Sequence, residues 1–514
     1  MKKTILAVFF ILLMFSIVFA SVSVTHYGAS KPVFGSCFLL ETQNAKVIID
    51  CGIFIRDDII NDSNQKNLQI LHKLIKAEAI FLTHAHLDHS GKIPLLVHEG
   101  FKGFIYSTEA TKQLTLALFR NRKGFDLIKR KWFWSESQKI KVRSNHNVVV
   151  VHWTDDCKNN IKSIEYSKDE VTLDDLEKKE GIRFVLCKNC CEVETKKIAK
   201  HFVALKYNED IKISDNLKAK FINAGHIPGS ASIIFESDGK KMLFSGNLGS
   251  GYSRFNDEFS IPEAVDLIFM EATYCDKKNK MEHYNVFRND LKKAISSKKI
   301  VWIPSLALNR TQKVLYELKL MQDAGILSKK IPIYSISSSA NVITSLYQKE
   351  VSKKDVKTSL RDWFLEEVYR KGTILPVNVK LQMIRNYNTQ MILLSSSGDM
   401  DRGLSEQLIP KMLMKKDVFV MIVSYVNPKS NAGLILQNKK THLGVKNIAK
   451  VKKYDVFSDH ADFCMLQKWL SKQNKNVKIY IIDSNKEHSQ IIENLLKDEG
   501  WINVHFANVE VTVN

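Results

Sequence analysis

The chain has 514 residues, of which 45% are hydrophobic and 25% charged, a composition typical of a folded globular protein and not of a disordered one. Its length favours two or three domains over a single core. The formal net charge of +21 favours polyanionic partners, nucleic acid before an acidic membrane surface or cell-wall polymer, although lysine is frequent throughout and explains part of the excess.

The first 20 residues have the pattern of an export signal. Lys2 and Lys3 precede an almost unbroken apolar run from Ile5 to Val18, and Val18-Phe19-Ala20 resembles a small-x-small cleavage site. We expect cleavage after Ala20, which leaves a secreted or periplasmic protein without a stable membrane span. An uncleaved N-terminal anchor is the alternative.

The eight cysteines are too few for a fold framed by disulfides. Cys37 and Cys51 lie in apolar, strand-like surroundings and are interpreted as small buried hydrophobic residues. The only CxxC pattern is Cys187-Lys188-Asn189-Cys190, followed by Cys191, and no second CxxC completes a zinc site. A local disulfide, involving Cys157 as one option, is favoured over a metal site there.

Short strands are predicted at Val22 to Tyr27, Ser36 to Thr42 and Lys46 to Asp50, separated by turn residues. Asp50 ends the third strand, where it could orient a ligand histidine or simply cap a turn. A helix is predicted over Asn67 to Ala77.

Four potential metal ligands follow the apolar run Ala79 to Leu82. They are His84, His86, Asp88 and His89. A buried strand end holds the backbone still, and the following turn can aim several short side chains at one point, which suits zinc or a similar divalent ion. A histidine-rich surface loop is the less favoured reading.

The segment Leu118 to Arg143 is both basic and aromatic, which suits either a nucleic-acid surface or an amphipathic helix with a solvated face. The polar segment Val171 to Lys197 has the character of an insertion. Strands then end in polar residues: His226 follows Ile211 to Asn223, Asn247 follows Lys241 to Ser245, and Glu271 follows Ala264 to Met270. His84, His86 and His226 could form a three-histidine metal site.

From about Asn279 to Gly444, helices alternate with apolar strands, which predicts a parallel-sheet α/β domain. Ser395-Ser396-Ser397-Gly398 follows one of its strands and could bind a phosphate through backbone N–H groups, although an ordinary strand-to-helix turn has the same composition. Near the end, His460 precedes a helix and Asp483 follows the strand Val477 to Ile482.

These motifs together resemble the metallo-β-lactamase superfamily and, within it, the β-CASP nucleases: RNase J-like enzymes, Artemis-like DNA nucleases and the messenger-RNA 3′-end-processing endonuclease. The matching stretches are Asp50, His84 to His89, Ala224 to Ala231, Glu271 to Tyr274, Arg310 to Gln312, Ser396 to Gly398 and Phe457 to Asp462.

The resemblance implies an α/β fold in which an αββα metallo-β-lactamase sandwich carries an inserted, parallel-sheet β-CASP domain. The expected divisions are a signal peptide at 1–20, the first part of the sandwich at 21–278, the β-CASP domain at 279–444, and the return to the sandwich at 445–514.

Two positions depart from the family pattern, and both concern its second metal. Asn247 replaces the aspartate that bridges two metals, and Asp483 stands where the last ligand histidine is expected. A neutral amide bridges two cations poorly, whereas a carboxylate can bind zinc, manganese or iron. We expect a remodelled site, for a different metal or a single metal, over a decayed site in a protein that only binds.

The resemblance implies that His84, His86 and His226 hold Zn²⁺, with Mn²⁺ or Fe²⁺ as alternatives, which lowers the pKa of a bound water. Asp88, His89, Asp483 and Asn247 would hold the uncertain second ion. Asp50, Asp88, Glu271 and His460 are the predicted catalytic residues, with His460 assisting the leaving oxygen and Glu271 orienting it. Ser396, Ser397, Gly398 and Arg310 would bind substrate phosphate.

The expected function is therefore that of an exported metal-dependent nuclease acting on single-stranded nucleic acid, RNA more than DNA, with a homodimer as an open possibility. One alternative is a catalytically impaired nucleic-acid-binding protein of the same fold. Another is a hydrolase of a different ester or amide substrate, which the large insertion and His460 argue against.

Overall fold

The computed structural model describes 15 segments of the chain, and the predicted signal peptide lies outside them. The described residues are 22–27, 35–53, 65–120, 140–141, 148–153, 161–165, 170–171, 183–186, 188–251, 258–273, 280–349, 374–376, 390–484, 486–506 and 510–513. Among the helices of these segments, none has the length and apolar character needed to cross a bilayer.

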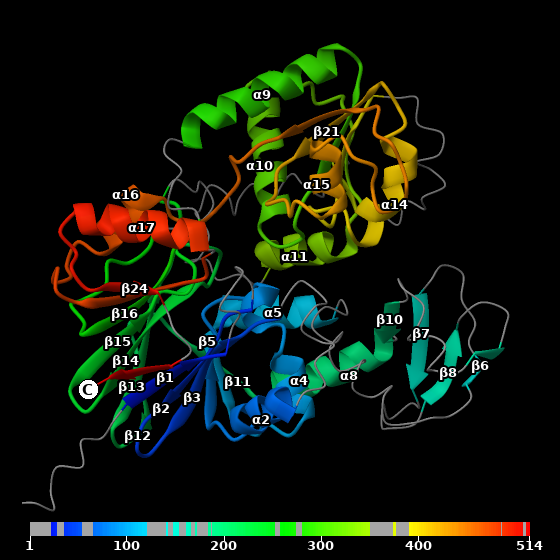
Figure 1. Cartoon of the computed structure of the whole chain (residues 1–514). Coiled ribbons are helices and arrows are strands. Elements are labelled where there is room, and N and C mark those ends of the chain that lie inside the picture. Colours follow the sequence, from blue (N-terminus) through cyan, green and yellow to red (C-terminus); the bar gives the residue numbers. More distant parts are fainter. Residues whose placement is uncertain are drawn as a thin grey trace, which may run out of the picture.

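Two seven-stranded sheets pack face to face in the lower part of Figure 1. The first has the order β11 (Phe202–Leu205), β5 (Phe104–Thr108), β4 (Ala79–Phe81), β3 (Lys46–Cys51), β2 (Cys37–Glu41), β1 (Val22–His26) and β25 (Glu510–Val513). The second has the order β12 (Asp210–Ser214), β13 (Leu217–Asn223), β14 (Ala231–Ser237), β15 (Lys240–Phe244), β16 (Leu267–Glu271), β23 (Lys478–Ile482) and β24 (Val504–Phe506).

Alternation along the strands builds the interior of this sandwich. Phe38 and Ile49 of the first sheet point inward and pack in one core with Phe221 and Phe235 of the second. Their sequence neighbours point outward, as Leu39 does, into a separate core beneath helices. Because both faces of each sheet are covered, the strands are apolar at successive positions.

Helices close both outer faces, which confirms the predicted αββα arrangement. The first sheet is covered by α2 (Gln65–Leu74), α4 (Ile93–His98), α5 (Glu109–Arg120) and α8 (Lys188–Ala199). The second is covered by α16 (Phe463–Trp469) and α17 (Lys486–Asp498). The chain therefore leaves the sandwich after β16 and returns to it with α16 and β23.

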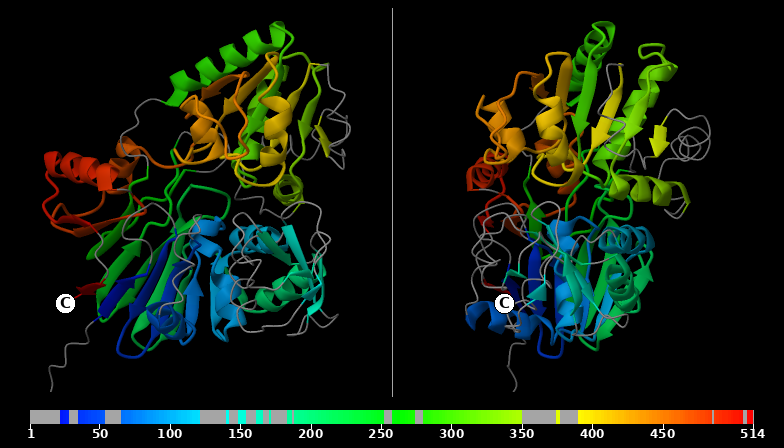
Figure 2. Two further views of the ribbon diagram at one scale, coloured as in Figure 1. Left: turned by 45° about the vertical axis from the view of Figure 1, so that its right-hand side comes forward. Right: turned by 90° about the vertical axis from the view of Figure 1, so that its right-hand side faces the viewer.

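A third, six-stranded sheet lies beside the sandwich, in the upper part of both views of Figure 2, and all of its strand pairs are parallel. Its order is β19 (Ile374–Pro376), β18 (Ile333–Ser335), β20 (Ile392–Ser395), β17 (Ile300–Pro304), β21 (Val418–Ile422) and β22 (Lys450–Lys453). One face carries α9 (Lys280–Ser296), α10 (Arg310–Asp323) and α11 (Ser338–Lys349), and the other carries α14 (Gly403–Met412) and α15 (Asn431–Leu436).

This parallel α/β sheet confirms the predicted inserted domain, but it extends past residue 444. Its edge strand β22 contains three lysines in four residues, and its side chains alternate between exposed and half-buried. Without an apolar run, the sequence alone did not indicate a strand there. The same apolar core includes Ala85 and Ile227 of the sandwich, so the two parts of the chain pack together.

The chain between α5 and α8 contributes small sheets that lie away from the sandwich, on the right of Figure 1, and most of their strands precede the predicted polar insertion at Val171 to Lys197. Strands β7 (Val148–Trp153), β8 (Ile161–Glu165) and β10 (Arg183–Leu186) form one sheet, and β6 (Ile140–Lys141) pairs with β9 (Glu170–Val171). The predicted basic and aromatic surface, Leu118 to Arg143, lies mostly outside the described residues, which here are only 118–120 and 140–141. Cys157 and Cys187 also lie outside them, as do the side chains of Cys190 and Cys191.

Candidate metal centre

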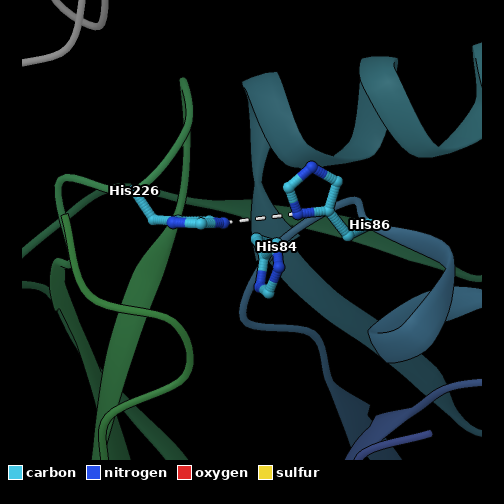
Figure 3. A group of neighbouring side chains, drawn as sticks. All are labelled: His84, His86 and His226. Atoms are coloured by element: carbon cyan, nitrogen blue, oxygen red, sulfur yellow. Dashed lines mark hydrogen bonds between the residues drawn. The ribbon is translucent and has the colours of Figure 1, made fainter. Parts of the chain in front are cut away.

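Three histidines from two loops converge at the edge of the sandwich. His84 and His86 follow β4, and His226 follows β13. Their ligand nitrogens all lie within 4.8 Å of one another, and His226 Nε2 is 3.3 Å from His86 Nδ1 (Figure 3). His84 and His226 are buried, while His86 is half-buried. The structure thus brings together the three residues expected to hold the first metal.

Burial keeps these imidazoles in the neutral form that metal binding requires. It lowers the pKa of His86 to about 4, and it lowers the pKa values of His84 and His226 well below their usual range, with the neighbouring histidines adding to the effect. Neutral imidazole nitrogens at this spacing are the ligands that zinc and similar divalent ions prefer. The donor set fits a single divalent ion.

Asp50 reaches this site because strand β3 contains a bulge. Phe38 pairs with Ile49 and Cys37 pairs with Cys51, so Asp50 is an extra residue without a partner on β2. Its φ of 55° places it in the left-handed region, as is common for one residue of a bulge. The bulge interrupts the alternation of side chains between the two faces of the sheet and points the Asp50 side chain toward the histidine loop.

Both carboxylate oxygens of Asp50 accept hydrogen bonds from that loop. Thr83 donates its backbone N–H to Oδ1 at 2.8 Å and its hydroxyl to Oδ2 at 2.7 Å, and His89 donates Nδ1–H to Oδ2 at 2.7 Å. The Thr83 hydroxyl hydrogen is already donated to Asp50, so Thr83 Oγ1 can only accept a hydrogen bond from His84. His84 therefore donates Nδ1–H to Thr83 Oγ1, 3.0 Å away. His84 therefore presents Nε2 as its ligand atom, so Asp50 acts by positioning histidines.

Strand ends and the histidine loop approach each other closely around Asp88 and His89. The carbonyl oxygen of Asp88 accepts a 2.8 Å hydrogen bond from Ser36 N–H, and a Cβ added to Gly52 would lie 1.5 Å from that oxygen.

Burial opposes a charge on His89, but the Asp50 carboxylate outweighs this effect and raises the pKa of His89 to about 10. Of the described residues, only His84, His86 and His226 form a compact ligand group; Asp88 and His89 do not join it.

Asn247 reaches the first metal position directly. It follows β15, is buried, and its Nδ2 lies 3.4 Å from His84 Nε2, the nitrogen assigned above to the metal. Its Oδ1 is buried without a hydrogen-bond partner. An amide donor therefore occupies the place where the family pattern expects a bridging carboxylate, as the sequence suggested.

Asp483 follows β23 and has a φ of 48°. Burial raises its pKa to about 7; the carboxylates of Asp50, Asp88 and Glu271 add to the shift, whereas His89 opposes it. Its Oδ2 is buried and accepts no hydrogen bond. An orphaned carboxylate oxygen among other acids indicates a position that a proton or a cation would stabilise.

Glu271 and His460 form an ion pair next to the triad. His460 Nδ1 lies 3.1 and 3.0 Å from the two carboxylate oxygens of Glu271, which is itself buried at the end of β16. Burial opposes the carboxylate charge, but His460, the side chain of Thr273 and the backbone N–H of Leu248 outweigh it and lower the pKa of Glu271. The His460 ring centroid is 4.6 Å from that of His226, so this pair borders the candidate metal position.

The predicted phosphate loop follows β20 in the third sheet. Ser396 shares a 2.7 Å hydrogen bond with Ser337, and a Cβ on Gly398 would lie 2.4 Å from Ser424 Oγ. Arg310 donates from one terminal nitrogen to the carbonyl of Val423. Three buried polar atoms around the loop have no hydrogen-bond partner: Ser397 Oγ, Ser424 Oγ and Arg310 Nε.

Three residues at these sites, Ser424 and the ion-paired Asp459 and Lys313, were given no role by the sequence reasoning. Ser424 lies two residues after β21 (Val418–Ile422), and only its position after a parallel strand could have indicated it. Asp459, beside His460, forms a buried ion pair with Lys313 of α10 and accepts a 2.6 Å hydrogen bond from Asn309. No local signal marks Lys313, since its partner lies 146 residues away.

Comparisons with known proteins agree with this architecture. Residues 30–157 match the family model described as "Metallo-beta-lactamase superfamily", and residues 311–435 match the model "Beta-Casp domain". A relative from Thermus thermophilus, "Ribonuclease TTHA0252", is 27% identical over 63% of this chain and 60% of its own length. The "Transcription termination factor FttA" of Methanosarcina mazei is 27% identical over 61% of this chain and 41% of its own.

A third relative matches along nearly its whole length. The "RNase J-like protein" of Methanocaldococcus jannaschii is 24% identical over 90% of this chain and 92% of its own. The chain spans less than two thirds of the Thermus and Methanosarcina proteins. The two family-model matches and the fold together show a metallo-β-lactamase domain and a Beta-Casp domain in this chain.

Proposed function

We propose that this protein is a metal-dependent hydrolase of phosphodiester bonds in single-stranded RNA. The observation that carries the proposal is the neutral triad of His84, His86 and His226 beside the His460–Glu271 pair. A divalent ion bound by the triad would supply the Lewis acidity that makes water nucleophilic near neutral pH. Zinc is the first choice for a three-histidine site, with manganese or iron as alternatives.

His460 is the group proposed to move a proton to the leaving oxygen. Glu271 holds its Nδ1, so proton transfer would use Nε2. Asp459 and Lys313 tie the backbone beside His460 to α10 of the third sheet. Through this ion pair, a movement of α10 when substrate binds to the third sheet would also move His460.

The third sheet is proposed to bind substrate phosphate. Ser397, Ser424 and Arg310 offer three buried polar atoms without partners, and phosphate oxygens would satisfy such donors. The net charge of +21 favours a polyanion as well. RNA is preferred over DNA as the substrate because the relatives are named as a ribonuclease, an RNase J-like protein and a transcription termination factor.

We further propose that the site works with one tightly held ion. The first position has its full set of histidines, whereas Asn247 presents an NH₂ group toward His84 and leaves no carboxylate to bridge two ions. The residues do not fit a family-like pair of metals.

Labelled single-stranded RNA and DNA of the same sequence, incubated with metal-loaded protein, provide the test. We expect cleavage of RNA to exceed cleavage of DNA, and a chelator to abolish both. Arg310→Ala is expected to raise the KM for RNA with a smaller effect on kcat, since Arg310 lies in the proposed phosphate site and not at the metal. The proposal would be contradicted if the protein hydrolysed a lactone or a thioester and did not cleave RNA.

A nucleic-acid-binding protein without catalysis is the second candidate, and the specific observation in its favour is the pair Asn247 and Asp483. It predicts RNA binding whose affinity falls steeply with salt, together with no cleavage under any metal. The incubation with labelled RNA therefore separates the two candidates, since only the hydrolase would cleave the RNA.

Export remains part of the proposal, supported by the charged start and the apolar run from Ile5 to Val18. We expect the protein recovered outside the cytoplasm to begin at Ser21, as measured by N-terminal sequencing or intact mass. A membrane-bound chain that still begins at Met1 would favour the anchor instead.

A further inference from the structure

We propose that Cys37 and Cys51 are joined by a disulfide when the chain folds under oxidising conditions. The two residues are Cα partners on the antiparallel strands β2 and β3, and their Sγ atoms lie 3.6 Å apart. Both side chains have 0% exposure. Sequence reasoning treated them as separate buried hydrophobic residues, because 14 positions separate them and neither belongs to a cysteine motif.

The backbone hydrogen bonds show which kind of cross-strand pair this is. Gly52 N–H donates to the carbonyl of Ser36 at 2.9 Å, so the bond joins the residue after Cys51 to the residue before Cys37. That pattern identifies Cys37 and Cys51 as a non-hydrogen-bonded pair, in which facing Cα atoms lie about 4.5 Å apart and side chains are closest. Disulfides span Cα separations of about 4.4–6.8 Å, so side-chain rotation can join these sulfurs.

The bulge at Asp50 is what places the two sulfurs on one face. Ile48 faces the helix-covered core and Ile49 faces the sandwich interior. Strict alternation would then send Cys51 into the sandwich interior, away from Cys37. Because the bulge adds one residue, Cys51 instead lies in the helix-covered core together with Cys37. One irregularity thus aims Asp50 at the histidine loop and creates the cysteine pair.

The chemistry requires a disulfide donor, since forming the bond removes two electrons. In thiol–disulfide exchange, one cysteine thiolate attacks the donor disulfide and forms a mixed disulfide. The second cysteine thiolate then displaces the donor, which leaves as two thiols. The two cysteines each lose one proton, and the Sγ–Sγ bond forms. Since both side chains are fully buried in the folded chain, the exchange takes place during folding.

The cross-link would hold the strand end that supplies Asp50. Cys51 directly follows Asp50, whose oxygens position Thr83, His84 and His89. A covalent tie between β2 and β3 at that point limits separation of the two strands and so keeps the Asp50 carboxylate in place. An exported enzyme would gain this support without losing any metal ligand.

Peptide mapping of the full chain tests the proposal. Trypsin cleaves after Lys46, which separates the two cysteines, so a disulfide appears as two linked peptides without reduction and as separate peptides after it. The chain is produced once in an oxidising compartment and once in a reducing one, and free thiols are blocked with N-ethylmaleimide during denaturation. The exposed Cys464 serves as the internal control for blocking.

We expect the linked peptides in soluble protein from the oxidising compartment only. In the native protein, we expect a small thiol reductant to open this bond far more slowly than after denaturation, because the sulfurs are buried. Recovery of soluble protein from the oxidising compartment with both cysteines carrying N-ethylmaleimide would overturn the proposal. So would linkage of either cysteine to a different cysteine, whatever the activity of the protein.

Discussion

Replacing His86 by alanine is expected to remove the bound divalent ion and to lower RNA cleavage by about 10³-fold or more, since metal activation supplies several kcal/mol of the rate enhancement. His86 is the best member of the triad to change. It is half-buried, whereas His84 and His226 are buried, so truncation leaves the smallest cavity. The loss should appear in kcat as well as in the metal content measured by elemental analysis.

The matched control is His72→Ala, which removes an exposed histidine of α2 that is not part of the triad. It is expected to keep the metal content and the activity of the unmodified protein. Thermal melting of the metal-free proteins checks that the His86 variant still folds. Cleavage that survives in the His86 variant would show that the triad does not catalyse the reaction, and a contaminating nuclease would then be the first explanation to test.

Changing Asn247 to aspartate and Asp483 to histidine together is expected to raise the metal content from one ion to two per chain. Asn247→Asp supplies a carboxylate beside His84, and Asp483→His supplies a neutral nitrogen where an orphaned carboxylate oxygen now lies. With Asp88 and His89, these residues would form a second set of ligands. The second ion would add charge stabilisation at the scissile phosphate, so cleavage should rise by about tenfold or more.

Each single variant separates the two contributions. Asn247→Asp alone supplies the carboxylate beside His84 but no neutral ligand at position 483, and should bind a second ion only weakly. Asp483→His alone lacks the bridge and should leave the metal content at one. Because neighbouring ligands act together, the double variant should exceed the sum of the singles. Two ions in the unmodified protein would refute the single-ion proposal, and Asp483 would then be the ligand to examine first.

Much of the fold follows from local patterns, and the structure shows why. Strands such as Lys46–Cys51 and Ile300–Pro304 are buried at nearly every position and mostly apolar, because both faces of their sheets are covered. The predicted sandwich and the inserted parallel domain are confirmed. The edge strand Lys450–Lys453 was missed because an edge with one exposed face needs no apolar run.

The histidine loop could be predicted from sequence for a related reason. His84, His86, Asp88 and His89 lie within six residues after a buried strand, so their proximity is a local property of the chain. His226 was found because it follows another strand end, but β4 and β13 belong to different sheets, and only the packing of the two sheets brings their ends together. The roles assigned to these residues stay predictions until the metal and the activity are measured.

Features that depend on strand register or on contacts between distant segments came only from the tertiary structure. The sequence by itself determined the composition, the order of strands and helices, and the spacing of the histidine loop. Only the folded chain showed that the bulge at Asp50 both turns a carboxylate toward Thr83 and His89 and sets Cys51 beside Cys37. Only the fold, likewise, pairs Lys313 with Asp459. Such features lie beyond sequence reasoning because a one-residue shift in register reverses the direction of every following side chain, and no local pattern records it.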